Sequence, residues 1–117
     1  MGYYSNVTGE LHIHGAVISK ETLKLLKLED LTYWARVQPD DIEEYTLFDF
    51  NYGDSGKAYD LEDQLLKLVE SFPNAVFRGE VVVQGEEPED RWRLVFNGRE
   101  VLKGTSKLVW DTETKLL

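Results

Sequence analysis

The sequence predicts a single α+β domain over residues 1–117, in which a mostly antiparallel sheet carries two helices on one face. Three observations lead to this prediction. Apolar and polar residues alternate in several short segments, two other segments carry an apolar stripe at helical spacing, and turn residues separate three strand-like segments near the C-terminus. Of the 117 residues, 42% are hydrophobic, which is enough for one core.

The first predicted strand lies within residues 3–18. Leu11 and Ile13 alternate with polar residues there, so one face of the strand is apolar. The other face carries Glu10, His12 and His14.

The next segments alternate between helix and strand. Residues 19–30 predict a short helix with Ser19 as its N-cap. Residues 31–38 predict a strand that ends at Pro39, and part of 45–50 alternates like a further strand.

The clearest helix signal lies in residues 60–72. Asp60 is the predicted N-cap, and Pro73 and Asn74 stop the helix. Its apolar stripe consists of Leu61, Leu65, Leu68, Val69 and Phe72.

The C-terminal part predicts a meander of three strands, at 75–85, 91–96 and 99–110. Asn97-Gly98 predicts a type I′ turn between the last two. The sheet edges expected to be free for pairing with a second copy are Ser5–Leu11 and Arg99–Lys107.

The charge is unevenly distributed. The net charge is −9, and residues 29–54 hold eight acidic residues and one basic residue, whereas the rest of the chain holds 14 acidic and 12 basic residues. Direct binding to nucleic acid needs a basic surface and is therefore disfavoured. A basic protein partner fits better.

Several classes of protein are disfavoured by what the sequence lacks. There is no cysteine, so disulfides and thiolate metal sites are excluded and a reducing cytoplasm is the expected location. No segment approaches the roughly 20 apolar residues of a membrane span. No motif for a cofactor is present, so none is predicted.

This chain resembles a family of small uncharacterised proteins from actinobacteria and their bacteriophages in three stretches, which are MGYYSNVTGEL, LEDQLLKLVESFPNAVFRGEVVVQGEEPEDRWRL and KLVW. The likeness covers the first dozen residues and about 50 residues of the C-terminal half, whereas 12–58 departs from the pattern. The family supplies no functional residues. The resemblance implies a phage origin, and small acidic phage proteins often bind and block host machinery in the host cytoplasm.

The two histidines raise the question of a metal or catalytic site. His12 and His14 share one strand face with Glu10, but a catalytic metal site needs three protein ligands and an open position, and no second cluster of ligands exists. No metal ligand and no catalytic residue is therefore predicted. An outward polar face is favoured, with a pH-sensitive contact surface as the alternative.

GDSGK at 53–57 matches parts of three motifs and completes none. A trypsin-like protease needs a longer chain, a phosphate loop needs Gly where Asn51 stands, and a calcium loop needs Gly where Asp54 stands. A flexible surface turn is predicted.

The sequence favours a non-enzymatic, acidic interaction protein that inhibits a basic host protein, acting as a nucleic-acid mimic if that protein binds nucleic acid. Two acidic runs next to aromatic residues would bind it. The predicted contact residues are Asp40, Asp41, Glu43, Glu44, Tyr45, Phe48, Asp49, Tyr52, Glu86, Glu87, Glu89 and Asp90.

Two alternatives remain. In the first, the open sheet face binds or hydrolyses a small anionic ligand such as a nucleotide, since imidazoles and cations suit phosphate. That face would consist of His12, His14, Arg91, Arg93 and Lys107. In the second, the chain is a structural module that forms a homodimer or larger oligomer.

Overall fold

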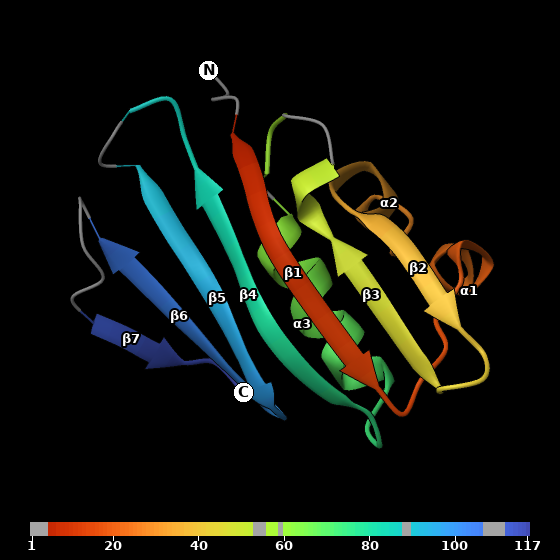
Figure 1. Cartoon of the computed structure of the whole chain (residues 1–117). Coiled ribbons are helices and arrows are strands. Elements are labelled where there is room, and N and C mark those ends of the chain that lie inside the picture. The colour runs from red at the N-terminus through yellow and green to blue at the C-terminus, as the bar shows by residue number, and fades with distance from the viewer. Residues whose placement is uncertain (1–4, 53–55, 59, 88–89, 107–111) are drawn as a thin grey trace.

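The computed structural model describes residues 5–52, 56–58, 60–87, 90–106 and 112–117, and it confirms the predicted α+β architecture (Figure 1). Within these residues, seven strands form one open antiparallel sheet in the order β2-β3-β1-β4-β5-β6-β7. The strands are β1 (Asn6–His14), β2 (Arg36–Asp40), β3 (Tyr45–Asp49), β4 (Val76–Gln84), β5 (Arg91–Gly98), β6 (Glu100–Ser106) and β7 (Thr112–Lys115). No helix in the described part of the chain is long and apolar enough to cross a membrane.

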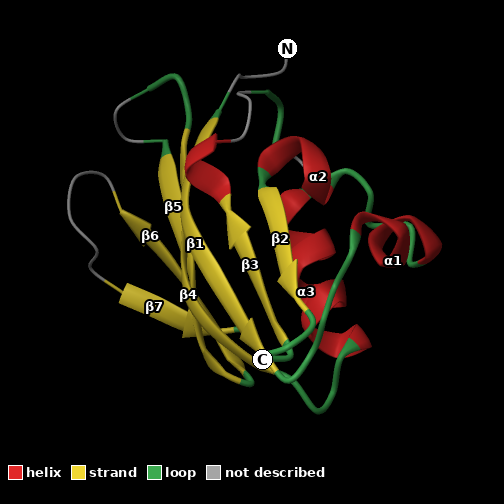
Figure 2. Cartoon of the chain, turned by 45° about the vertical axis from the view of Figure 1, so that its right-hand side comes forward, coloured by secondary structure: helices red, strands yellow, loops and turns green. Residues whose placement is uncertain are grey.

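Three α-helices lie on one side of the sheet (Figure 2). They are α1 (Lys20–Leu25), α2 (Leu31–Trp34) and α3 (Leu61–Ser71), and a short 3₁₀ helix, η1 (Phe50–Tyr52), directly follows β3. The predicted cap of α1 is confirmed, because the Ser19 hydroxyl accepts a hydrogen bond from the Thr22 N–H at 3.2 Å. Asp60 stands at the predicted N-cap position of α3, but its side chain accepts no capping hydrogen bond.

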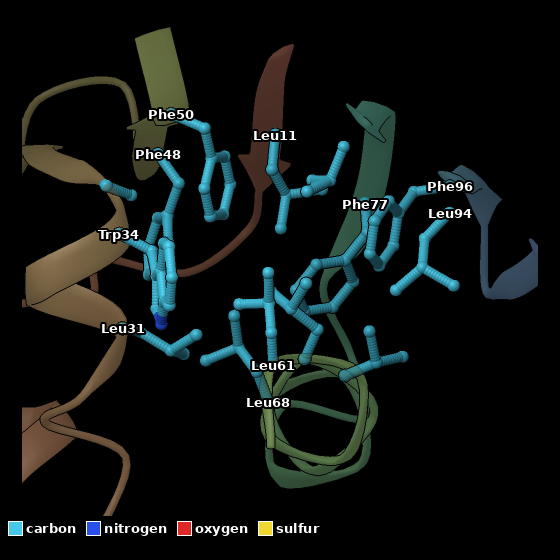
Figure 3. Packing of buried hydrophobic residues seen from close by; sticks show 14 of the residues in the cluster. Leu11, Leu31, Trp34, Phe48, Phe50, Leu61, Leu68, Phe77, Leu94 and Phe96 are labelled. Carbon is cyan, nitrogen blue, oxygen red and sulfur yellow. The ribbon is translucent and has the colours of Figure 1, made fainter. Parts of the chain in front are cut away.

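The core lies between α3 and the sheet. Figure 3 shows Leu61 and Leu68 of α3 directed toward Phe77, Leu94 and Phe96 of the sheet. Alternate strand residues are buried here because successive side chains of a strand point to opposite faces. The opposite face of the sheet carries most of the polar strand residues.

The predicted strand over 31–38 is wrong in its first half. Leu31 and Trp34 stand three positions apart and are both buried, which is the spacing of one helix face, and these residues form α2. The strand itself runs through Pro39, which is tolerated because β2 is an edge strand of the described sheet.

The hairpin predicted at Asn97-Gly98 exists, but its turn is shifted by one residue. Asn97 pairs with Glu100, so the two turn residues are Gly98 and Arg99. Only Gly98 has a positive φ, of 78°, which matches a type II′ turn rather than type I′. The shift gives Arg99 a structural role: its guanidinium donates to the carbonyl oxygens of Val69, Phe72 and Ala75 at the end of α3, at 3.0, 2.8 and 3.2 Å.

The strand predicted over 99–110 is β6 as far as Ser106, residues 107–111 lie outside the described part, and β7 follows. Neither predicted free edge is an edge. β1 lies between β3 and β4, and β6 lies between β5 and β7. In the described sheet the edges are β2 and β7.

The two central strands approach each other closely at a pair of glycines. Gly9 of β1 and Gly79 of β4 have φ values of 113° and 132°, a region that side chains rarely allow. A Cβ on Gly9 would stand 2.0 Å from the Glu80 carbonyl oxygen, and one on Gly79 would stand 2.1 Å from the Glu10 carbonyl oxygen. Each strand therefore occupies the space that a side chain of the other would need.

We predict that Gly9→Ala destabilises the protein by roughly 3 kcal/mol or more, because it adds a collision with a backbone atom to an unfavourable φ. Gly98→Ala is the matched control, since its φ is also positive but its Cβ would meet nothing within 4 Å. It should cost about 1 kcal/mol. Urea unfolding measures both, and equal losses in the two variants would contradict the close approach of β1 and β4.

Candidate binding surfaces

The β2–β3 hairpin presents the first acidic run. Its loop, residues 41–44, connects the ends of the two strands at the lower right of Figure 1. Asp40 organises the loop, because its Oδ1 accepts hydrogen bonds from the N–H groups of Ile42 at 3.0 Å and Glu43 at 3.2 Å. Asp40, Asp41, Glu43 and Glu44 are all exposed, and none of them forms an ion pair with any described residue.

An apolar residue stands in the middle of these carboxylates. Ile42 is 91% exposed, the largest value among the exposed large hydrophobic residues described. Next to it, a shallow groove of about 430 Å³ opens on the polar face of the sheet. We call this the acidic groove, and it is lined by Gln38, Pro39, Asp40, Asp41, Ile42, Tyr45 and Leu47.

The root of the hairpin is fixed by Thr46, which is fully buried. Its hydroxyl accepts a hydrogen bond from the Ile18 N–H at 2.8 Å and donates one to the Ala16 carbonyl at 3.0 Å. The Gly15 N–H donates to the Glu44 carbonyl at 2.8 Å. The loop is thus held on a rigid base while its charged side chains stay in solvent.

Two predicted contact residues are not part of this surface, because they are buried. Phe48 is fully buried in the core, because its position in β3 has the parity of Thr46 rather than that of Tyr45. Asp49 is also buried, and its Oδ1 accepts a hydrogen bond from the Asn51 N–H at 3.1 Å. The side chain of Tyr52 lies outside the described part.

The second acidic run does not join the first. Glu86, Glu87 and Asp90 are exposed in the β4–β5 connection, at the opposite end of the sheet from the acidic groove (Figure 1). Asn6 pairs with Gln84, and His14 pairs with Tyr45, so the two loops are separated by the length of β1, about 26 Å. Glu89 lies outside the described residues.

The residues of the predicted anion site are dispersed over the open face. His12 of β1 pairs with Arg78 of β4, and Arg93 of β5 pairs with Val82 of β4. These two positions of β4 are four residues apart, which corresponds to about 13 Å along the strand. Arg91 lies still farther along, and Lys107 is outside the described part. The Arg93 guanidinium also forms an ion pair with Glu80 at 3.2 Å. These cations and imidazoles therefore do not form one phosphate site.

Both histidines instead surround Tyr45. The ring centres of His12 and His14 lie 5.9 and 5.0 Å from the Tyr45 ring. The Tyr45 oxygen lies 2.5 Å from Nδ1 of His12, whose Nε2 lies 3.6 Å from a carboxylate oxygen of Glu10. Burial raises the pKa of the Tyr45 phenol above its ordinary value of 10.0, and the Glu10 carboxylate raises it further.

This cluster answers the question of the His-x-His pattern. A nucleophilic tyrosine needs a lowered pKa, and here the pKa shift has the opposite direction, so the phenol keeps its proton while hydrogen-bonded to Nδ1 of His12. Among the described residues, no three His, Asp or Glu side chains are placed to hold a metal ion. The cluster forms a wall of the acidic groove through Tyr45.

Asp49 and Asn51, the carboxylate and amide residues of the partial calcium motif, both form hydrogen bonds within the protein. Asn51 Oδ1 accepts a hydrogen bond from the Gly9 N–H at 3.1 Å, and Asp49 binds the Asn51 backbone. In the GDSGK segment, Gly56 is buried and exchanges two backbone hydrogen bonds with Ser5, at 2.6 and 3.1 Å. The end of this segment is therefore tied to the N-terminal strand.

A second cavity involves residues that the sequence did not single out. It lies between α2 and the start of α3 and includes Tyr33, which is 47% exposed, and Gln64. Sequence reasoning missed this region because its parts are distant in sequence.

Comparisons with known proteins add no assignment. Neither a scan against protein-family models nor searches of curated proteins and solved structures found a match for this chain. The resemblance to actinobacterial and phage proteins therefore stays a prediction.

We predict that the free energy of unfolding falls less steeply at high pH in Tyr45→Phe than in the parent. The phenol has a higher pKa in the folded chain than in the unfolded chain, so its contribution to stability is fully present below pH 10.0 and is lost as the pH rises through the folded pKa. Urea unfolding at about pH 8 and about pH 11 measures the slope. Tyr33→Phe, which leaves Tyr45 in place, should keep the slope of the parent, and an unchanged slope in Tyr45→Phe would contradict the assignment.

Proposed function

We propose that this protein is a non-enzymatic interaction protein that binds a basic surface of another protein through the acidic groove and the loop at 41–44. The observation that carries the proposal is the exposed Ile42 among four carboxylates that form no ion pair with described residues. An apolar anchor within a charged surround is the arrangement that gives protein interfaces both affinity and steering.

The chemistry of the groove favours lysine and arginine side chains as its occupants. Asp40 and Asp41 supply charge, Tyr45 supplies an aromatic wall, and Leu47 supplies a partly buried apolar floor. A guanidinium can combine ion pairing with stacking on an aromatic ring, and its methylene groups can cover an aliphatic side chain. The attraction of carboxylates that form no ion pair with described residues would offset part of the cost of desolvating a partner's cations.

The proposed consequence is inhibition. A partner that ordinarily binds nucleic acid presents such a basic surface, and occupying it with carboxylates would block the phosphate sites. The predicted phage origin would make this partner a protein of the host. The acidic loop at 86–90 faces the other end of the sheet and is not part of the proposed contact.

The test is a charge reversal that spares the loop's structure. We expect Asp41→Lys, Glu43→Lys and Glu44→Lys together to abolish binding, because repulsion replaces attraction at the contact. Asp40 is kept because it holds two backbone N–H groups. The matched control carries Glu29→Lys, Glu70→Lys and Glu87→Lys, three exposed positions away from the groove with the same change in net charge.

The measurement uses the tagged parent, the hairpin variant and the control as bait in nuclease-treated actinobacterial lysate, with quantitative mass spectrometry of what is retained. The proposal predicts one dominant basic protein that is retained by the parent and the control and lost from the hairpin variant. Ile42→Ser should weaken its retention without changing the net charge. A partner retained equally by all variants, or no partner at all, would refute this function.

A further inference from the structure

A separate cavity of about 420 Å³ lies at the other end of β2, between α2 and the N-terminal end of α3. It is lined by Asp30, Tyr33, Trp34, Gly56, Lys57, Asp60, Leu61 and Gln64. Its volume falls within the roughly 300–1,000 Å³ typical of small-molecule sites. The acidic groove shares none of these residues.

The cavity is rich in hydrogen-bond acceptors. The Gln64 amide N–H donates to Asp30 Oδ2 at 3.2 Å, which turns its carbonyl oxygen, Oε1, away from that carboxylate. Oε1 is buried and accepts no hydrogen bond from the described residues. A buried carbonyl without a donor is costly, and this atom has no accessible surface through which a ligand in the cavity could reach it.

The orientation of this amide follows from its partner. Exchanging the nitrogen and oxygen of Gln64 would place two acceptors against each other at Asp30 and would leave an amide N–H buried without a partner. The unsatisfied atom is therefore an acceptor.

A second carboxylate is free for the same ligand. Asp60 stands at the N-cap position of α3, but its side chain accepts no capping hydrogen bond, and it lines the cavity instead. Asp30 and Asp60 are both exposed at the residue level, so they remain accessible to solvent and to a ligand. Two carboxylates thus line the same space.

Aromatic residues complete the wall. Tyr33 and Trp34 meet edge to face, with ring centres 5.1 Å apart and an angle of 86° between their planes. Trp34 is 6% exposed and reaches from α2 into the core, as Figure 3 shows, whereas Tyr33 is 47% exposed. Such rings attract a cation over their faces and pack against its carbon atoms.

We infer that this cavity binds an organic cation, an alkylammonium or guanidinium group, between the Tyr33–Trp34 pair and the carboxylates of Asp30 and Asp60. The carboxylates balance its charge and accept its N–H groups, and the rings cover its carbon atoms. The inference does not depend on the proposed function, because the residues of the two sites are different.

Lys57 gives the site an internal test. Its ammonium lines the same cavity and forms no ion pair with a described residue, so it repels an incoming cation. Removing that charge should tighten cation binding, whereas it would weaken the binding of an anion. Lys57→Met and the two aspartate variants therefore have opposite expected effects.

The experiment is a titration of the ¹⁵N-labelled chain at constant ionic strength, followed by the backbone amides of Trp34, Leu61 and Gln64 and the indole N–H of Trp34. The probes are N-methylguanidinium, methylammonium, choline and the tripeptide Gly-Arg-Gly with blocked ends. Urea and tert-butanol are the neutral counterparts, and acetate and phosphate are the anionic ones.

We expect saturable shifts with the cations, with a Kd on the order of 1 mM, and none with the neutral or anionic probes. Asp60→Asn and Asp30→Asn should each weaken binding about fivefold, and Lys57→Met should strengthen it about twofold. Binding of the tripeptide in preference to choline assigns the site to a side chain of a polypeptide. The reverse preference assigns it to a free small cation.

Three results would overturn the inference. They are the absence of saturable shifts with any cation, equal shifts with urea or tert-butanol, and binding of acetate or phosphate that Lys57→Met weakens. Asp60→Asn removes no hydrogen bond made by a described residue, so an unchanged spectrum of the free variant shows that any loss of binding is not a loss of folding.

Discussion

The fold depends on the pairing of β1 with β4. These are the two longest strands of the described sheet, with nine residues each, and they pair over their full length at its centre. The approach at Gly9 and Gly79 is reciprocal about the pair Glu10 and Glu80, with each glycine facing the carbonyl of the opposite strand. The other strands are added on the two sides of this pair. The β2–β3 hairpin lies next to β1, and the meander of β5, β6 and β7 lies next to β4.

This central pairing separates two tasks. One face of the sheet is covered by α3 and provides the core, so the stability of the protein rests on buried apolar residues such as Leu11 and Phe77. The other face and the hairpin loop are left with polar groups. Repulsion among the carboxylates at 40–44 is tolerated because Thr46 and Phe48 anchor the base of the hairpin in the buried part of the structure.

Sequence periodicity predicted the fold class, α3 and the meander because each of these is set by residues close together in the chain. It failed where a tertiary contact decides the outcome. The short helix α2 buries both Leu31 and Trp34 in the core, and the shifted turn after β5 places Arg99 against the carbonyl oxygens at the end of α3. The residues that contact these two segments are distant in sequence.

The candidate sites show the same limit. The acidic hairpin was visible as a charge run, but alternation alone did not exclude Phe48, because the face on which each β3 residue lies is set by the pairing with β1. Asp49 has the same parity as Tyr45, and it is buried with its carboxylate hydrogen-bonded to the Asn51 N–H. The cavity at α2 joins residues 30–34 to residues 56–57 and 60–64, and its carboxylates and aromatic rings come together only in the folded chain.

The two sites lie at opposite ends of β2, and both place carboxylates next to aromatic rings. They differ in enclosure: the groove is open on the sheet surface and suits the side chains of a large partner, whereas the cavity is backed by Trp34, a residue of the core. A charged ligand in the cavity would touch the same α2 segment that precedes β2 directly. Since β2 is an edge strand held only by β3 within the described sheet, it is the element through which occupancy of one site could reach the other.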